Sequence, residues 1–94
     1  MKQKSIIRTE KAGVFFGEIK ERNGQEGTIT NCRRLWYWSG AASLSQLAVE
    51  GASRPNDCKF TMVVEKMVVL GIIEIIPCTQ KAIESINSVA VWKV

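Results

Sequence analysis

The chain has no histidine, and Asp57 is its single aspartate. The absence of histidine excludes Ser-His-Asp and Cys-His nucleophilic sites, histidine metal ligands and a histidine pH switch. The glutamates are mostly isolated, and neither a GxxxxGK[ST] nor a GxGxxG motif is present. We therefore predict that the protein is not an enzyme and uses no cofactor and no metal, since catalytic sites need convergent titratable groups.

Cysteine is scarce and widely spaced. The three cysteines, Cys32, Cys58 and Cys78, lack the close spacing of a zinc knuckle or a redox motif. Their odd number, together with the lack of a signal peptide, predicts free, buried thiols in a reducing cytoplasm.

Long uncharged apolar runs are also missing. The most hydrophobic stretch, residues 60–76, is interrupted by Glu65, Lys66, Gly71 and Glu74. It is too short and too charged to span a bilayer, so we predict no membrane association.

What is present is an ordinary globular composition with a mild positive charge. The 94 residues are 46% hydrophobic and 23% charged, which predicts one folded domain over residues 1–94. The net charge of +4 arises in the first half of the chain. This permits anion or nucleic-acid binding, but a charge of +4 is mild, and a solvated surface is the preferred interpretation.

Local patterns predict an α+β domain: a mostly antiparallel β-sheet with two short helices. An Asn23-Gly24 hairpin turn, a capping box from Ser43 to Gln46 with a stop at Gly51, and a bend near Gly71 are the clearest signals. The predicted strands are residues 5–9, 14–21 and 28–38, two strands within 60–76, and 88–94. The predicted helices are residues 43–50 and 80–86, the second capped by Thr79.

The strand 28–38 carries the most informative segment. Strict alternation would place Ile29, Arg33 and Leu35 on one face, and Cys32, Arg34 and Trp36 on the other. From Leu35 onward both faces bear large apolar groups, which predicts that this half of the strand is covered on both sides, by a helix on one and by another sheet or a subunit on the other.

This segment and the turn after it form the candidate ligand- or partner-binding site. An arginine would anchor an anion, an aromatic ring would stack or act as an interface hot spot, and the glycine-containing strand-to-helix junction would bind a phosphate or carboxylate. The alternative is structural: the aromatic rings pack in the core, the arginines extend to solvent, and the serines and glycine turn and cap the chain. The candidate residues are Arg33, Arg34, Trp36, Tyr37, Trp38, Ser39, Gly40 and Ser43.

Three segments resemble a family of small proteins of unknown function encoded by tailed phages and prophages. The resemblance rests on NCRRLWYWSGAASLSQLAVEG (31–51), KAGVFFGEI (11–19) and IEIIPCTQKAIESINSVAVWKV (73–94). It implies an accessory gene product expressed in the bacterial host cytoplasm during infection, and it carries no catalytic motif.

These observations leave several functional hypotheses. The first is an accessory binding protein that inhibits a host defence or another host process, either by binding a host protein or by sequestering a small nucleotide-like anion. The second is a nucleic-acid-binding protein, and the third is a structural or assembly protein of the phage. A strand-rich chain of this size has sheet edges to protect, so we also predict homo-oligomerisation.

Overall fold

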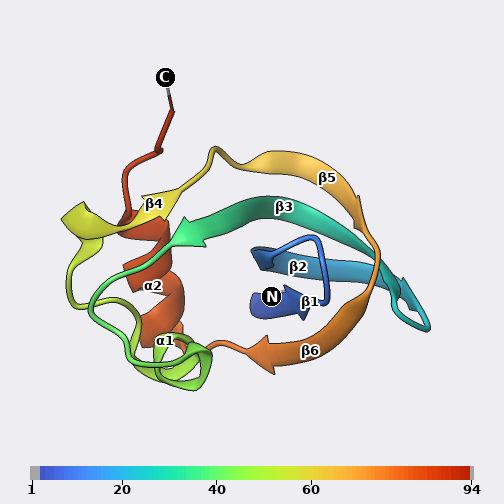
Figure 1. Ribbon diagram of the computed structural model, residues 1–94, viewed down its shortest axis with the longest axis horizontal. Helices are drawn as coiled ribbons and strands as arrows, with labels where there is room; N and C mark the ends of the chain where they lie inside the picture. Colours follow the sequence, from blue (N-terminus) through green and yellow to red (C-terminus); the bar gives the residue numbers. More distant parts are fainter. Residues whose placement is uncertain (1–2, 94) are drawn as a thin grey trace.

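The computed structural model describes residues 3–93, in which six strands form one antiparallel sheet and two helices pack together beside it (Figure 1). The strands are β1 (Ser5–Thr9), β2 (Val14–Asn23), β3 (Glu26–Tyr37), β4 (Lys59–Phe60), β5 (Val64–Val69) and β6 (Ile72–Pro77). The helices are α1 (Leu44–Glu50) and α2 (Gln80–Ser88), with a 3-10 turn η1 (Pro55–Asp57) between α1 and β4. The predicted α+β class is confirmed.

β3 pairs with a different strand at each end: its first half pairs with β5 and its last residues pair with β4. The order is β4-β3-β2-β1-β6, and β5 pairs with β3 on the same side as β4. β5 and β6 are consecutive in the chain, yet they lie at opposite edges of the sheet, which curves strongly between them (Figure 1). Gly71, at φ 75°, makes the bend, and its carbonyl accepts the Glu10 N–H at 2.9 Å. The predicted bend near Gly71 is therefore confirmed.

Local turn and cap signals act as expected. Asn23 pairs with Glu26 across the predicted hairpin, with Gly24 at φ 61°. The Ser43 hydroxyl accepts the Gln46 N–H at 3.1 Å, but the Gln46 side chain binds the Ala42 N–H instead of the Ser43 N–H of a strict capping box.

The hydrophobic core consists of two clusters on opposite faces of β1 and β2, because alternate side chains of each strand point in opposite directions. The first fills the space against the helices and includes Ile6, Phe16, Leu35, Leu47, Phe60, Ala82 and Ile86. The second joins both edge strands to the centre of the sheet and contains Ile7, Phe15, Ile29, Cys32, Val69 and Ile72.

Strict alternation along β3 is wrong at one point. Asn31 has φ 49°, and the register with β2 shifts at this position. This bulge rotates the chain, so that Ile29 and Cys32 share a cluster while Arg33 faces the helices. Within the described chain Trp36 is 62% exposed at the strand end, so the predicted cover on its second side stays a prediction of a partner subunit.

The predicted strand 88–94 is wrong in extent. α2 continues through Ser88, and only Val91 makes an isolated parallel bridge, to Phe60. β4 is two residues long, so it offers the C-terminal segment little backbone with which to pair. Val94 lies outside the described residues. No helix in residues 3–93 is long and apolar enough to cross a membrane.

Candidate functional site

Two exposed tryptophans from distant parts of the sequence stack on each other. The ring centroids of Trp36 and Trp92 are 6.0 Å apart, and the ring planes differ by 11°. The Lys59 Nζ lies 5.5 Å from the Trp92 ring centroid, within cation–π range. We call Trp36, Tyr37, Lys59 and Trp92 the aromatic platform.

Strand pairing explains why these four residues meet. β4 pairs with the end of β3, which sets Lys59 opposite Tyr37. The segment after α2 then lies along the other side of β4, where the Trp92 N–H donates to the Phe60 carbonyl at 2.9 Å. The platform is therefore formed by three adjacent backbone segments.

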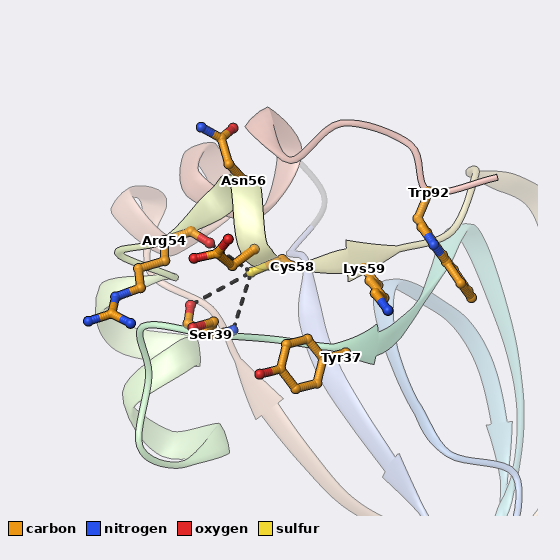
Figure 2. Close-up of a pocket in the computed structure, with 8 residues that line it drawn as sticks. Tyr37, Ser39, Arg54, Asn56, Cys58, Lys59 and Trp92 are labelled. Atoms are coloured by element: carbon orange, nitrogen blue, oxygen red, sulfur yellow. Dashed lines mark hydrogen bonds between the residues drawn. The ribbon is translucent and has the colours of Figure 1, made fainter.

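A cavity of about 570 Å³ opens beside the platform. Figure 2 shows Lys59 and Trp92 toward one end, Arg54 and Asn56 toward the other, and Tyr37 between them. The cavity thus has an aromatic end and a polar end, and its described lining carries two cations and one carboxylate. The lining residues are Tyr37, Ser39, Arg54, Asn56, Asp57, Cys58, Lys59 and Trp92.

Cys58 ties together the two loops at the polar end. Its Sγ accepts the Ser39 N–H at 3.4 Å, and its one S–H has two carbonyl oxygens within reach, those of Arg54 at 3.5 Å and Ser39 at 3.7 Å (Figure 2). The nearly buried thiol therefore positions Ser39 and Arg54.

Arg33 lies beneath the platform and is not part of its surface. The residue is 3% exposed, and its guanidinium donates to the backbone carbonyls of Thr61, Phe60, Ile86 and Val89. Because these N–H groups are already paired and the residue is buried, we leave Arg33 out of the ligand-contacting set.

Arg34 faces the other side of β3, as alternation predicts for adjacent residues. Its guanidinium carbon lies 4.9 Å from the Phe15 ring centroid, in the second core cluster. Its Nε is buried and has no hydrogen-bond partner among the described residues. Arg34 does not line the cavity beside the platform.

The remaining predicted residues separate into two groups. Ser39 lines the cavity, whereas Trp38 is half-buried against the first core cluster. Gly40, at φ 86°, accepts two hydrogen bonds from Ser53 through its carbonyl, and Ser43 caps α1. These are turn and cap roles. The structure thus brings Trp36, Tyr37 and Ser39 together at the platform and cavity.

Sequence reasoning missed six of the nine residues at the platform and cavity. Arg54 and Asn56 lie in the connection between α1 and β4, which has no binding motif, and no sequence pattern places Lys59 and Trp92 beside Trp36. A tryptophan near the end of the chain is a weak signal by itself. Its position depends on the pairing of the tail with β4, which local sequence does not encode.

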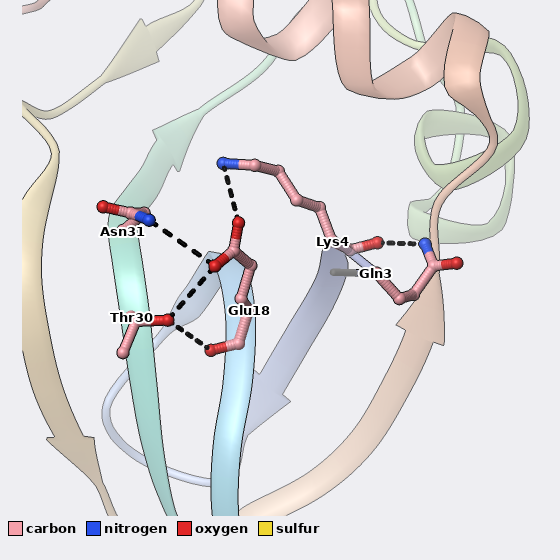
Figure 3. Close-up of polar contacts among 5 residues, drawn as sticks. All are labelled: Gln3, Lys4, Glu18, Thr30 and Asn31. Carbon is pink, nitrogen blue, oxygen red and sulfur yellow. Dashed lines mark hydrogen bonds and ion pairs between the residues drawn. The ribbon is translucent and has the colours of Figure 1, made fainter. Parts of the chain in front are cut away.

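A second hollow, of about 320 Å³, lies near the start of β1. There the Glu18 carboxylate lies 3.9 Å from the Lys4 Nζ and accepts hydrogen bonds from Thr30 and Asn31 at 3.3 and 3.5 Å (Figure 3). These partners satisfy the carboxylate, which we assign a structural role. Residues 3–93 contain no group of three or more Cys, Asp or Glu side chains that could hold a metal ion.

Comparison with known proteins identifies one family. Residues 2–86 match the family described as "Domain of unknown function (DUF6948)". The search of curated proteins and the search of solved structures returned no match to the chain.

Proposed function

Because the chain belongs to this family of unknown function, we propose a function from its own geometry: a binding module that holds a nucleotide-like anion at the aromatic platform. The observation that carries the proposal is the exposed Trp36–Trp92 stack beside Lys59 and an open cavity. The proposed role is binding without a chemical step.

Exposed aromatic rings favour a flat ligand. Trp36 is 62% exposed and Trp92 45% exposed, although burial of such rings would stabilise the fold. Stacking of a base on an aromatic side chain contributes about 1–3 kcal/mol, as measured by alanine substitution. A nucleobase on Trp92 or Tyr37 would remove this apolar surface from water.

The cations beside the rings favour a phosphate. Lys59 and Arg54 are at opposite ends of the cavity, with the rings near Lys59 (Figure 2). An Arg guanidinium binds phosphate in a bidentate manner, and a Lys ammonium binds it as a point charge. A base at the aromatic end and a phosphate near a cation fit within a volume typical of small-molecule sites.

In the phage setting that the sequence resemblance implies, such a module would act in the bacterial host cytoplasm. Sequestering a small anionic signal would inhibit a host defence or another host process that depends on it. The same exposed tryptophans would serve as hot spots on a host protein surface, which is the alternative form of this proposal.

Two other functions are alternatives to this proposal. An aromatic platform with a lysine also fits single-stranded nucleic acid, whose binding weakens steeply with salt. A structural or assembly role in the phage predicts that the protein is present in purified particles.

The proposal predicts that Trp92→Ala and Lys59→Gln each weaken mononucleotide binding by about tenfold, since stacking and charge-assisted contacts contribute about 1–3 kcal/mol. Isothermal titration calorimetry with AMP, GMP, CMP and UMP would measure the dissociation constants.

Lys20→Gln is the matched control, because it removes an equal charge from β2, away from the platform. Its affinity should equal that of the unmodified protein. The proposed site would be contradicted if none of the four mononucleotides bound, or if Lys20→Gln and Lys59→Gln lost the same amount of affinity.

A further inference from the structure

We propose that Arg33 is the positioning residue of the aromatic platform: it fixes the segment that carries Trp92, and so sets the geometry of the Trp36–Trp92 stack. The functional meaning of this inference rests on the proposed function, but the geometric claim does not.

The guanidinium of Arg33 joins three pieces of backbone. Its Nε donates to the Thr61 carbonyl at 2.9 Å, and its Nη2 to the Phe60 carbonyl at 3.2 Å. Its Nη1 donates to the Ile86 and Val89 carbonyls at 3.1 and 3.2 Å. One side chain on β3 therefore holds β4, the residue after it, the last turn of α2 and the start of the C-terminal segment.

Arg33 and Trp92 share an acceptor. The Phe60 carbonyl receives the Arg33 Nη2–H and also the Trp92 N–H at 2.9 Å. At the other end, Val89 is where the chain leaves α2 toward Trp92. The guanidinium thus fixes both the departure of this segment and the carbonyl on which Trp92 is held.

Arg33 forms no ion pair with the described residues, whose two ion pairs are Lys4–Glu18 and Arg8–Glu74. Its positive charge is nevertheless stabilised by the carbonyls around it. Carbonyls at a helix C-terminus carry partial negative charge, and α2 ends at the carbonyls that Arg33 binds. Burial lowers the Arg33 pKa, yet a guanidinium stays charged in proteins.

Only arginine meets the geometric requirement. Its planar fork presents five N–H donors in fixed directions, whereas lysine has three donors on one nitrogen. A lysine at this position would keep the charge but leave some of the four carbonyls without a donor. The segment after Val89 would then depend on the isolated Val91 bridge, the Trp92 N–H and the ring stack.

The test is Arg33→Lys, read out without any ligand. Stacked indoles give an exciton couplet in circular dichroism, which Trp92→Ala identifies by abolishing it. We expect Arg33→Lys to reduce the couplet strongly and to speed hydrogen exchange of the Trp92 amide by about tenfold or more. The amides of the β1–β2 pairing should keep their protection, because the carbonyls bound by the Arg33 side chain all lie in other segments.

Arg34→Lys is the matched control, since it is adjacent in sequence but points to the other core cluster. It should leave both the couplet and the Trp92 amide unchanged. If Arg33→Lys is unfolded in buffer, the spectra are repeated in trimethylamine N-oxide, which favours the folded state.

Three results would overturn the inference: an unchanged couplet in folded Arg33→Lys, a uniform loss of protection over the whole chain, or failure to fold even with the osmolyte. The first would show that the fork is dispensable, and the other two that Arg33 is a general structural residue. Failure of mononucleotide binding by the unmodified protein would refute the proposed function alone, and would leave these readouts intact.

Discussion

At the scale of single residues, Arg33 and Arg34 show how neighbouring side chains of one type acquire different roles. Arg33 points toward the helices, where carbonyls at the end of α2 surround it. Arg34 points into the opposite core cluster and lies over Phe15. The face of β3, rather than the residue type, decides whether the guanidinium binds backbone carbonyls or lies over an aromatic ring.

The sequence pattern marked this segment as a candidate site, and the structure separates its residues into two groups. Trp36, Tyr37 and Ser39 lie at the platform or cavity, where their predicted role in binding stays a prediction. Ser43 caps α1, as the structural alternative expects, whereas Arg33 is buried and does not extend to solvent. Whether a polar group is already paired depends on distant backbone, so composition and spacing could not distinguish the two cases.

Two buried thiols predict that stability falls in alkaline solution. Burial raises the pKa of Cys32 and of Cys78 from 9.0 to about 11. Between these values the unfolded chain loses thiol protons that the folded chain keeps, so the free energy of unfolding decreases as pH rises above about 9. Each thiol contributes at most about 1.4 kcal/mol per pH unit in this window.

Urea unfolding between pH 8 and pH 11 would measure this slope. The double variant Cys32→Ala Cys78→Ala removes both groups and should show a shallower alkaline slope, although it is less stable overall. An equal slope in the two proteins would assign the alkaline loss to other groups and contradict the prediction.

At the scale of secondary-structure elements, the close approach of β2 to its neighbour β3 requires a glycine. A Cβ built at Gly17 would lie 2.7 Å from the Ile29 Cγ2, 3.0 Å from the Thr30 carbonyl oxygen and 3.1 Å from the Cys32 Cα. Two of these atoms belong to backbone at the Asn31 bulge, so the strand itself would have to move. We predict that Gly17→Ala lowers the free energy of unfolding by about 1–3 kcal/mol.

Gly24→Asn is the control for this prediction, measured by the same denaturant titration. Gly24 has positive φ, which Asn tolerates, and open space around its Cα. Its effect should stay within about 0.5 kcal/mol. Equal destabilisation by both substitutions would show that the close approach at Gly17 is unimportant.

Elements with local signals were predicted well, and elements set by tertiary contacts were not. The Asn23-Gly24 turn, the caps at Ser43 and Thr79, and the bend at Gly71 depend on a few neighbouring residues. The Asn31 bulge depends on how β3 packs between β2 and β5, and no neighbouring sequence signal predicts it. The C-terminal segment was read as a strand because its apolar alternation cannot reveal the length of its partner.

At the scale of the whole molecule, β5 is a sheet edge surrounded by exposed apolar side chains. In the described chain it pairs only with β3, and its neighbourhood exposes several large apolar side chains. These are Met62, Val63, Val64, Val68, Leu70 and Ile73. An open apolar edge favours pairing with another strand, which agrees with the homo-oligomer predicted from the sequence.

We predict that a second copy pairs along β5 and that Val68→Lys shifts the protein toward the monomer. Val68 is 57% exposed, and a charge at an edge disfavours edge-to-edge pairing. Sedimentation velocity at several concentrations would measure the shift. Val49→Lys, on α1 and 55% exposed, is the control. A monomeric unmodified protein, or an equal shift with both substitutions, would contradict the prediction.

The central claim is that the aromatic platform and its cavity hold a nucleotide-like anion. The most direct test is a native mass spectrum of the protein purified from bacterial cytosol without refolding, beside the Trp92→Ala Lys59→Gln double variant prepared in the same way. The account predicts added mass of nucleotide size on the unmodified protein and none on the variant. A protein without added mass, or the same added mass on both, would contradict it.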